Sequence, residues 1–136
     1  MRTTDIESLI PQRPPIKMID VFEYEDENTG LSELSVVADN IFVEDDTMMA
    51  EGILEHVAQT AAALIGYRRK MAGMEVNIGV IGDMKHCSFD SELPKTGETI
   101  KTRIGIVSQL GNITMIESLS QVDGRTMAQC RMKLAN

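Results

Sequence analysis

The sequence lacks the features of a membrane, secreted or nucleic-acid-binding protein. No apolar run approaches the ~20 residues that a membrane-spanning helix needs, and the opening MRTTDIESLI carries no long apolar stretch of a secretion signal. Lys and Arg (13) are outnumbered by Asp and Glu (21), and the resulting net charge of −8 disfavours binding to a phosphate backbone. We therefore expect a cytoplasmic protein with no nucleic-acid partner and no membrane partner.

Cysteine and aromatic residues are also scarce. The only two cysteines, Cys87 and Cys130, form no CxxC pair and are too few for a structural zinc site, so we predict buried free thiols and no bound metal. There is no Trp, but there are ten methionines. Methionine is an adaptable core filler, and it also suits the lining of a site for a flexible acyl chain. Nothing in the sequence indicates a cofactor.

The 136 residues are most simply one domain, 1–136, with one long helix at its centre. Residues 48–73 carry apolar side chains at helical spacing around most of the circumference, which is typical of a buried helix. Thr47 is a candidate N-cap and Gly73 a candidate C-terminal cap. The small residues in the middle of this segment predict that a sheet approaches the helix closely.

The remaining segments read as a short helix and a series of strands. Thr4 and Glu7 have the spacing of a capping box for the short helix. Asp123-Gly124 is a strong signal for a two-residue hairpin turn. We predict an α+β fold, an antiparallel sheet of five to six strands around the central helix, with strands near 16–24, 31–38, 77–91, 98–110, 113–122 and 125–134.

Glu55 is the unusual residue of the central helix. It shares a face with Gln59, one turn later, within a largely apolar segment. A buried carboxylate is costly unless it is paired or neutral. Glu55 is therefore a candidate catalytic residue. The alternative is that its carboxylate makes a hydrogen bond across a dimer interface and has a purely structural role.

Two phrases in the sequence resemble a known family. IESLIPQRPPIKMID at 6–20 is similar to the opening of the 3-hydroxyacyl-acyl-carrier-protein dehydratases, and LEHVAQTAA at 54–62 is similar to the family's phrase on its central helix. GDMKHCSF at 82–89 and PKTGE at 94–98 are weaker echoes of a strand and a turn. The resemblance covers nearly the whole chain and implies the hotdog fold.

The resemblance also implies a reaction, partners and site residues. Dehydratases of this family remove water from 3-hydroxyacyl thioesters of acyl-carrier protein, giving trans-2-enoyl thioesters, at a site between two protomers. The family's helix carboxylate corresponds to Glu55. Its histidine should fall between residues 40 and 49, where this chain has none. His56 and His86, the only histidines, are the candidate replacements; Asp45 and Asp46 are alternatives as partners of the carboxylate.

Substrate contacts are predicted at the helix start and the loop before it. Backbone N–H groups at a helix N-terminus suit a carbonyl on which negative charge develops, and Gly52 has no side chain to obstruct a thioester. The predicted substrate-binding residues are Phe42, Met49, Ala50, Gly52 and Gln59. Arg68, Arg69 and Lys70 complement the negative end of the helix dipole, or form a contact site for an acidic partner.

Three functions remain open from sequence. The first is a dehydratase acting on acyl-carrier-protein or coenzyme A thioesters in fatty-acid, polyene or polyketide synthesis, as a homodimer or higher multiple. The second is a catalytically silent hotdog subunit that binds acyl-carrier protein or an active paralogue, favoured by the missing histidine. The third is an acyl thioesterase in which the same carboxylate activates water.

Overall fold

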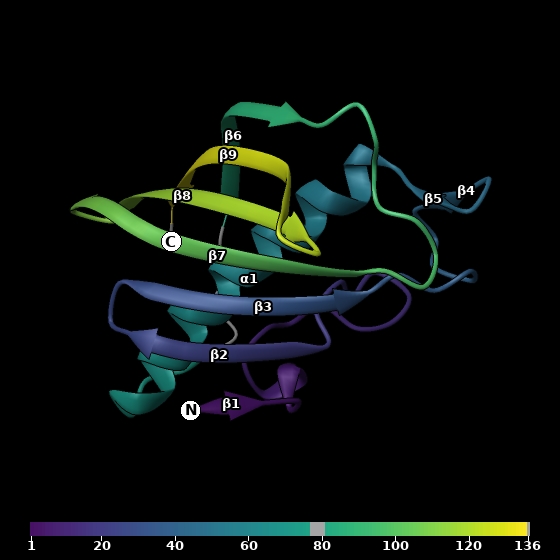
Figure 1. Cartoon of the computed structure of the whole chain (residues 1–136). Helices are drawn as coiled ribbons and strands as arrows, with labels where there is room; N and C mark the ends of the chain where they lie inside the picture. Colours follow the sequence, from purple (N-terminus) through teal and green to yellow (C-terminus); the bar gives the residue numbers. More distant parts are fainter. Residues whose placement is uncertain (77–80, 136) are drawn as a thin grey trace.

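The structure, a computed structural model, describes residues 1–76 and 81–135, and it consists of one long helix wrapped by a curved antiparallel sheet (Figure 1). The elements in chain order are β1 (Arg2–Thr3), a 3₁₀ turn (Ile6–Ser8), β2 (Val21–Asp26), β3 (Thr29–Ser35), β4 (Val43–Glu44), β5 (Thr47–Met48), α1 (Ala50–Met71), β6 (Ile81–Phe89), β7 (Thr99–Leu110), β8 (Ile113–Val122) and β9 (Arg125–Ala135). The predicted α+β hotdog fold is confirmed.

The large sheet has the strand order β1-β2-β3-β7-β8-β9-β6, and every neighbouring pair is antiparallel. Among the described residues it contains seven strands rather than five or six, because the two-residue strand β1 pairs with β2 at one edge. The strand that follows the helix, β6, forms the other edge and is bonded only to β9 within the described chain. One side of β6 is therefore open to a further strand.

The core lies between α1 and the concave face of the sheet. Ile53, Val57, Ala61 and Leu64 recur on one side of α1 and are fully buried. Alternate residues of the strands meet them, because side chains of a strand point to opposite faces in turn. The strand residues buried against the helix include Phe22, Leu34, Ile100, Ile104, Ile116, Met127, Met132 and Leu134.

A segment between the 3₁₀ turn and β2, residues 9–18, crosses the side of α1 that the sheet leaves uncovered. We call it the strap. At Gly66 the strap comes so close that an added Cβ would lie 2.1 Å from the Leu9 carbonyl oxygen. The small residue at this position is therefore required by the strap, whereas the sequence attributed the small residues of the helix to the sheet.

Two turns that were predicted from local sequence are found in the structure. Gly73 has a φ of +70°, and the N–H groups of Gly73 and Met74 donate to the carbonyls of Lys70 and Arg69, which is the Schellman arrangement that ends a helix. Asp123 and Gly124 both have positive φ, 50° and 78°, as the predicted hairpin turn requires.

The chain before β2 departs from the predictions. The cap of the first turn is Asp5, not Thr4, and no side chain caps it, because only a single 3₁₀ turn forms (Ile6–Ser8). The strand predicted from residue 16 begins at Val21. Residues 16–18 are instead held in the strap by the helix. Part of the strand predicted over 77–91 lies outside the described residues.

Candidate active site

Glu55 is held in place by Gln59. The Gln59 side-chain amide donates one hydrogen bond to Glu55 Oε1 (3.0 Å) and another to the Ile16 carbonyl (2.9 Å), while its oxygen accepts from the Met18 N–H (2.6 Å). Gln59 is 1% exposed, so these bonds are made in a dry environment where they are strong. The amide thus fixes one carboxylate oxygen of Glu55 and fastens the strap at the same time.

Glu55 is half-buried and lies on the side of α1 turned away from the sheet. Ala58 and Ala62 follow it on the same side, at i+3 and i+7. These two alanines line a narrow groove of about 70 Å³ between the strap and the β6 side of the sheet, bordered also by Gly82 and Leu134. Glu55 Oε2 has no hydrogen-bond partner within the described chain. The carboxylate is therefore anchored by one oxygen and available through the other.

The start of α1 offers hydrogen-bond donors. The N-cap is Met49, not the predicted Thr47, and no side chain caps the helix. The N–H of Gly52 donates to the Met49 carbonyl (3.0 Å), while those of Ala50 and Glu51 have no acceptor among the described residues. The first N–H groups of a helix lack intrahelical partners and carry its positive dipole end. The unpaired donors at the start of the helix in the described chain are therefore those of Ala50 and Glu51, and not that of Gly52.

Gly52 has a different reason to be glycine from the one expected. A Cβ at this position would lie 2.6 Å from Cβ of Phe42 and 3.1 Å from Cγ of Met48. The space beside Gly52, where a thioester was expected to pass, is thus filled by Phe42. The Phe42 side chain holds the loop against the helix, and so does a hydrogen bond from the Met49 N–H to the Phe42 carbonyl (2.9 Å).

Asp45 and Asp46 are not beside Glu55. They form the turn of a small hairpin between β4 and β5, with φ of 52° and 66°, and both are exposed. Figure 1 shows this hairpin projecting at the right of the molecule. In this arrangement neither of them pairs with the Glu55 carboxylate within the described chain.

His56 is fully buried in a polar network between α1 and the sheet. Nδ1 donates to the Met18 carbonyl (2.7 Å), which leaves Nε2 to accept from the Thr102 hydroxyl (2.9 Å). The Thr102 hydroxyl is hydrogen-bonded to the Ser120 hydroxyl (2.7 Å), and the Ser32 hydroxyl lies 3.4 Å from Nε2 of His56. Burial lowers the pKa of His56 from 6.5 to about 4, against smaller opposing effects of the Met18 carbonyl and the Asp20 carboxylate.

His56 therefore acts as a neutral anchor. Its ring faces the sheet, and its proton is committed to the carbonyl of Met18, the same strap residue whose N–H is bonded by Gln59. Consecutive helix residues are about 100° apart, so the ring points away from the groove beside Glu55. Within the described chain its hydrogen bonds go to the strap and to a strand hydroxyl, and none goes to Glu55.

His86 lies on the other side of the sheet from Glu55. Regular alternation along a strand would put His86 on the same face as Met84, but a bulge in β6 between Met84 and His86 inserts Lys85 and reverses the alternation after it. Met84 and Cys87 both pack against the core, while His86 is exposed beside Arg131 on the convex face. The sheet separates this imidazole from α1, so it does not replace the missing loop histidine within one chain.

Both cysteines are free thiols and face each other across β6 and β9; Cys130 is buried, as predicted, whereas Cys87 is only half-buried. Burial, reinforced by the Cys87 thiol, raises the pKa of Cys130 to about 12, so this thiol is protonated at neutral pH. Over residues 1–76 and 81–135 there is no group of three or more His, Cys, Asp or Glu placed to hold a metal ion. No helix in the same part of the chain is long and apolar enough to cross a membrane.

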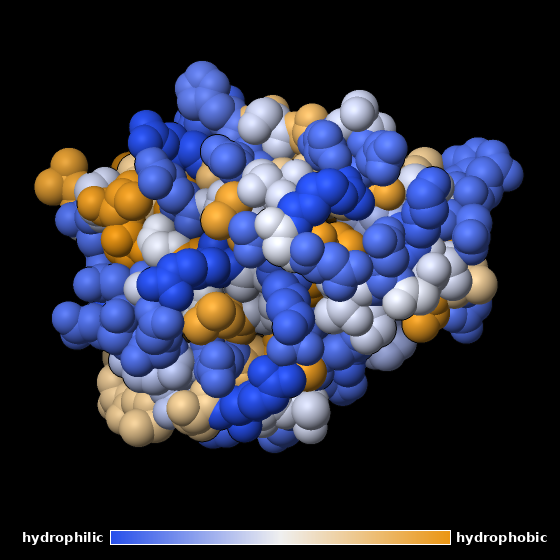
Figure 2. Space-filling model, viewed as in Figure 1, coloured by the Kyte–Doolittle hydropathy of each residue, from blue (hydrophilic) through white to orange (hydrophobic). Residues whose placement is uncertain are grey.

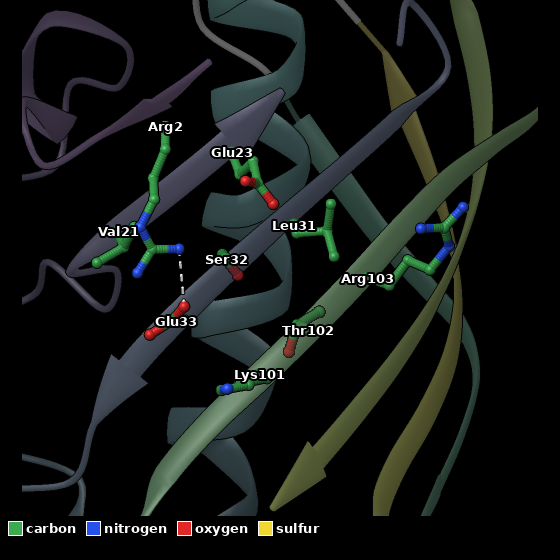
Figure 3. Close-up of a pocket in the computed structure, with 9 residues that line it drawn as sticks. All are labelled: Arg2, Val21, Glu23, Leu31, Ser32, Glu33, Lys101, Thr102 and Arg103. Atoms are coloured by element: carbon green, nitrogen blue, oxygen red, sulfur yellow. Dashed lines mark hydrogen bonds and ion pairs between the residues drawn. The ribbon is translucent and has the colours of Figure 1, made fainter. Parts of the chain in front are cut away.

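The convex face of the sheet carries a separate hollow of about 240 Å³ over β2, β3 and β7 (Figure 3). Its rim is charged: Arg2 and Glu33 form an ion pair (3.0 Å), and Lys101 and Arg103 stand on β7 beside it. Figure 2 shows the same face, with hydrophilic side chains in blue around smaller apolar patches in orange. Because the sheet lies between this hollow and Glu55, it is not part of the candidate active site.

The sequence did not predict the hydroxyl groups that surround His56. Ser32, Thr102 and Ser120 occupy inward positions of neighbouring strands, and Thr60 follows His56 by one helical turn. The sequence does contain a sign of this polar network, because serine and threonine occupy core-facing positions of strands whose other core-facing residues are apolar. Only the strand register, which pairs Ser32 with Thr102 and Thr102 with Ser120, shows that they meet.

Three solved structures illustrate how widely this fold occurs. The dehydratase heterocomplex ApeI:P from Xenorhabdus doucetiae matches with a TM-score of 0.83 at 14% identity, covering 96% of this chain and 90% of that chain. The PaaI protein of E. coli, from a phenylacetic acid degradation operon, matches with a TM-score of 0.63 at 13% identity, over 85% and 81%.

A hypothetical thioesterase from Streptococcus pneumoniae, solved with coenzyme A, has a TM-score of 0.60 at 11% identity, over 84% of each chain. At these identities the matches establish the fold and nothing further. No curated protein matches the chain. The family comparison is more specific, because the model of the ApeP-like family, described as ApeP dehydratase, matches residues 4–136. The chain therefore belongs to the ApeP-like family of dehydratases.

Proposed function

We propose that this chain is the Glu55-bearing subunit of a dehydratase that converts 3-hydroxyacyl thioesters into trans-2-enoyl thioesters. One observation carries the proposal: Gln59 holds Oε1 of Glu55 at 3.0 Å while Oε2 stays unpaired within the described chain. A carboxylate so oriented, one and two helical turns before the alanines that line the groove (Ala58 and Ala62), is arranged to take a proton from a bound substrate.

The chemistry needs three groups. The carboxylate of Glu55 takes the proton from C2, and the resulting negative charge on the thioester oxygen is stabilised by the free N–H groups of Ala50 and Glu51. The C3–O bond then breaks, the hydroxyl leaves as water with a proton from a general acid, and the C2=C3 double bond forms. Gln59 keeps the carboxylate in position throughout.

The general acid is either Glu55 itself, which returns the proton it took, or an imidazole of a second hotdog subunit. The second arrangement is favoured because neither histidine of this chain is beside Glu55: His56 is fully buried and His86 is on the convex face. The open edge of β6 and the groove next to it provide a surface on which such a subunit would pair and cover the site. A homodimer and a heterodimer both fit this edge.

The thioester is proposed to be carried by acyl-carrier protein or by coenzyme A. A role in fatty-acid, polyene or polyketide synthesis follows from that substrate class and is part of the same proposal, as is a cytoplasmic location. The solved ApeI:P complex, a dehydratase heterocomplex by its description, supports a pairing with a different subunit.

The test is Glu55→Gln, with Glu44→Gln as the matched control. Glu44 is an exposed carboxylate on β4. Short 3-hydroxyacyl thioesters are supplied to the wild type and to both variants. Where the chain alone is inactive, they are supplied to its complex with a histidine-bearing hotdog partner. We expect Glu55→Gln to lose enoyl formation by roughly 10²- to 10⁴-fold and Glu44→Gln to retain it.

Measuring free acid and enoyl thioester in the same samples separates the alternatives. Glu55-dependent release of free acid in place of enoyl thioester identifies a thioesterase and contradicts the proposal. Activity of the complex that survives Glu55→Gln unchanged shows that this chain is a silent subunit.

A further inference from the structure

The basic side chains at the end of α1 lack the carboxylate partners that most other cations of the chain have. In the part of the chain that the structure describes, seven Lys and Arg residues form ion pairs, among them Arg103 with Glu25 and Arg125 with Asp90. Within residues 1–76 and 81–135 neither Arg68 nor Arg69 pairs with a carboxylate. In a chain of net charge −8, two neighbouring unneutralised cations form a local positive site.

The structure divides the basic cluster seen in the sequence. Lys70 turns toward the 3₁₀ turn, where its Nζ lies 3.4 Å from the Ser8 hydroxyl. Arg68 and Arg69 instead border one hollow of about 250 Å³ between the end of α1 and the β7–β8 hairpin. Arg69 is fixed by a hydrogen bond from Nε to the Glu75 carbonyl (2.7 Å), which leaves its outer nitrogens free to bind.

Apolar side chains lie beside these cations. Met74 lines the hollow and is 51% exposed, while Met71, one turn after Arg68, is 69% exposed. Leu110, at the tip of the neighbouring hairpin, is 82% exposed. Figure 2 shows apolar atoms both at the hairpin tip on the left and at the lower left, where α1 ends in Figure 1. A surface that combines exposed methionine with arginine is typical of protein contact sites.

The hollow is linked to the candidate active site through Arg69. Arg69 and Ile65 border both the hollow and the groove that contains Ala58 and Ala62. Arg69 is fourteen residues after Glu55, which is about 21 Å along the axis of α1. This span is on the order of the length of a phosphopantetheine arm, so a carrier bound at the hollow is within reach of Glu55.

We propose that the hollow bordered by Arg68, Arg69 and Met74 is the docking site of the acidic carrier protein that presents the acyl thioester. The inference rests on the proposed function and names the partner and the place where it binds. Acidic side chains of the carrier pair with Arg68 and Arg69, its apolar side chains cover Met71 and Met74, and its arm follows the groove to Glu55. An anionic membrane is a poorer fit, since lipid-binding surfaces usually carry four or more clustered cations.

The test compares two substrates in the same enzyme preparation. One is a 3-hydroxyacyl group on the complete acyl-carrier protein, and the other is the same acyl group on N-acetylcysteamine, which has neither protein nor phosphate. We expect Arg68→Glu to lower kcat/KM at least tenfold for the carrier-linked substrate and to leave kcat/KM for the short substrate unchanged, because Arg68 borders the hollow and not the groove. The loss should shrink at high salt, because exposed charges are screened.

Lys101→Glu is the matched control, since Lys101 is exposed on the convex face of the sheet and makes no ion pair with any described residue. Its kcat/KM with the carrier-linked substrate should stay near that of the wild type. Equal losses in Lys101→Glu and Arg68→Glu overturn the proposal, because they indicate a general charge effect. An equal loss of kcat/KM with the coenzyme A thioester of the same acyl group also overturns the proposal, because it means that Arg68 interacts with the phosphate and not with the carrier protein.

Direct binding separates this inference from the proposed function. The affinity of the wild type and of Arg68→Glu for the carrier protein is measured by calorimetry, with vesicles containing phosphatidylserine as a second titrant. Weakened carrier binding by the variant supports the docking site even where neither substrate is converted. Unchanged carrier binding, or binding of the wild type to vesicles but not to the carrier, overturns it.

Discussion

The buried His56 makes a quantitative prediction about stability at acid pH. Burial lowers the pKa of His56 in the folded chain from 6.5 to about 4. Between pH 6.5 and pH 4 the imidazole is therefore protonated in the unfolded chain but neutral in the folded chain. The stability that His56 contributes is fully present above pH 6.5 and is lost as the pH falls toward 4. Since one pKa unit corresponds to about 1.36 kcal/mol, the loss between pH 7 and pH 4 amounts to about 3 kcal/mol.

The measurement is urea unfolding at pH 7, 6, 5 and 4, followed by circular dichroism at one protein concentration so that any association is held constant. The carboxylates of the chain also titrate in this range, so the quantity of interest is a difference between variants. We expect the wild type to lose about 3 kcal/mol more than His56→Gln between pH 7 and pH 4, because the variant has no imidazole to protonate.

His86→Gln is the control, because His86 is exposed and lies on the opposite face of the sheet. Its stability should follow that of the wild type at every pH. Parallel curves for the wild type and His56→Gln would refute the reasoning, since they would mean that the buried ring does not titrate with unfolding.

Three further variants test the strap and the turns. Gly66→Ala should destabilise the fold by about 1–3 kcal/mol in urea unfolding, because its Cβ would meet the Leu9 carbonyl oxygen at 2.1 Å. Gln59→Leu should cost about 2–4 kcal/mol and also reduce enoyl formation, because it leaves the Met18 N–H unpaired and releases Glu55. Gly124→Ala should lower stability by about 1 kcal/mol, measured by thermal unfolding, because φ at this position is +78°.

Matched variants show whether these effects are local. Gly105→Ala introduces a Cβ whose nearest neighbour is 4.0 Å away, so it should be close to neutral where Gly66→Ala is not. Gln129→Leu changes an exposed glutamine on β9 and should leave enoyl formation intact. If either control lost as much as its counterpart, the proposed contacts of Gly66 or Gln59 would not be the cause.

Elements whose signals are local in the chain were predicted well from sequence. The helix over 48–73 was found at Ala50–Met71, and the hairpin turn at Asp123-Gly124 was found with both residues at positive φ. The strand over 113–122 was predicted without error. These features depend on the spacing of apolar residues and on the conformational freedom of Asp and Gly, and a short window of sequence contains both.

The candidate site could be predicted only in part. Glu55 and Gln59 share a face because four residues make about one turn, and their hydrogen bond follows from that spacing. The positions of the two histidines depend on other segments. A single inserted residue in β6 turned His86 to the convex face, and the burial of His56 required hydroxyls from β3, β7 and β8 to meet it in register.

The helix, its carboxylate and the run of hairpins could thus be predicted from sequence, because periodicity and turn chemistry act between near neighbours. The surroundings of that carboxylate could not be predicted in this way. Gly52 accommodates Phe42, Gly66 accommodates the strap, and Arg68 and Arg69 share a hollow that Lys70 does not reach. Each of these outcomes results from contacts between segments far apart in the chain, and their distances are fixed only when the sheet closes around the helix.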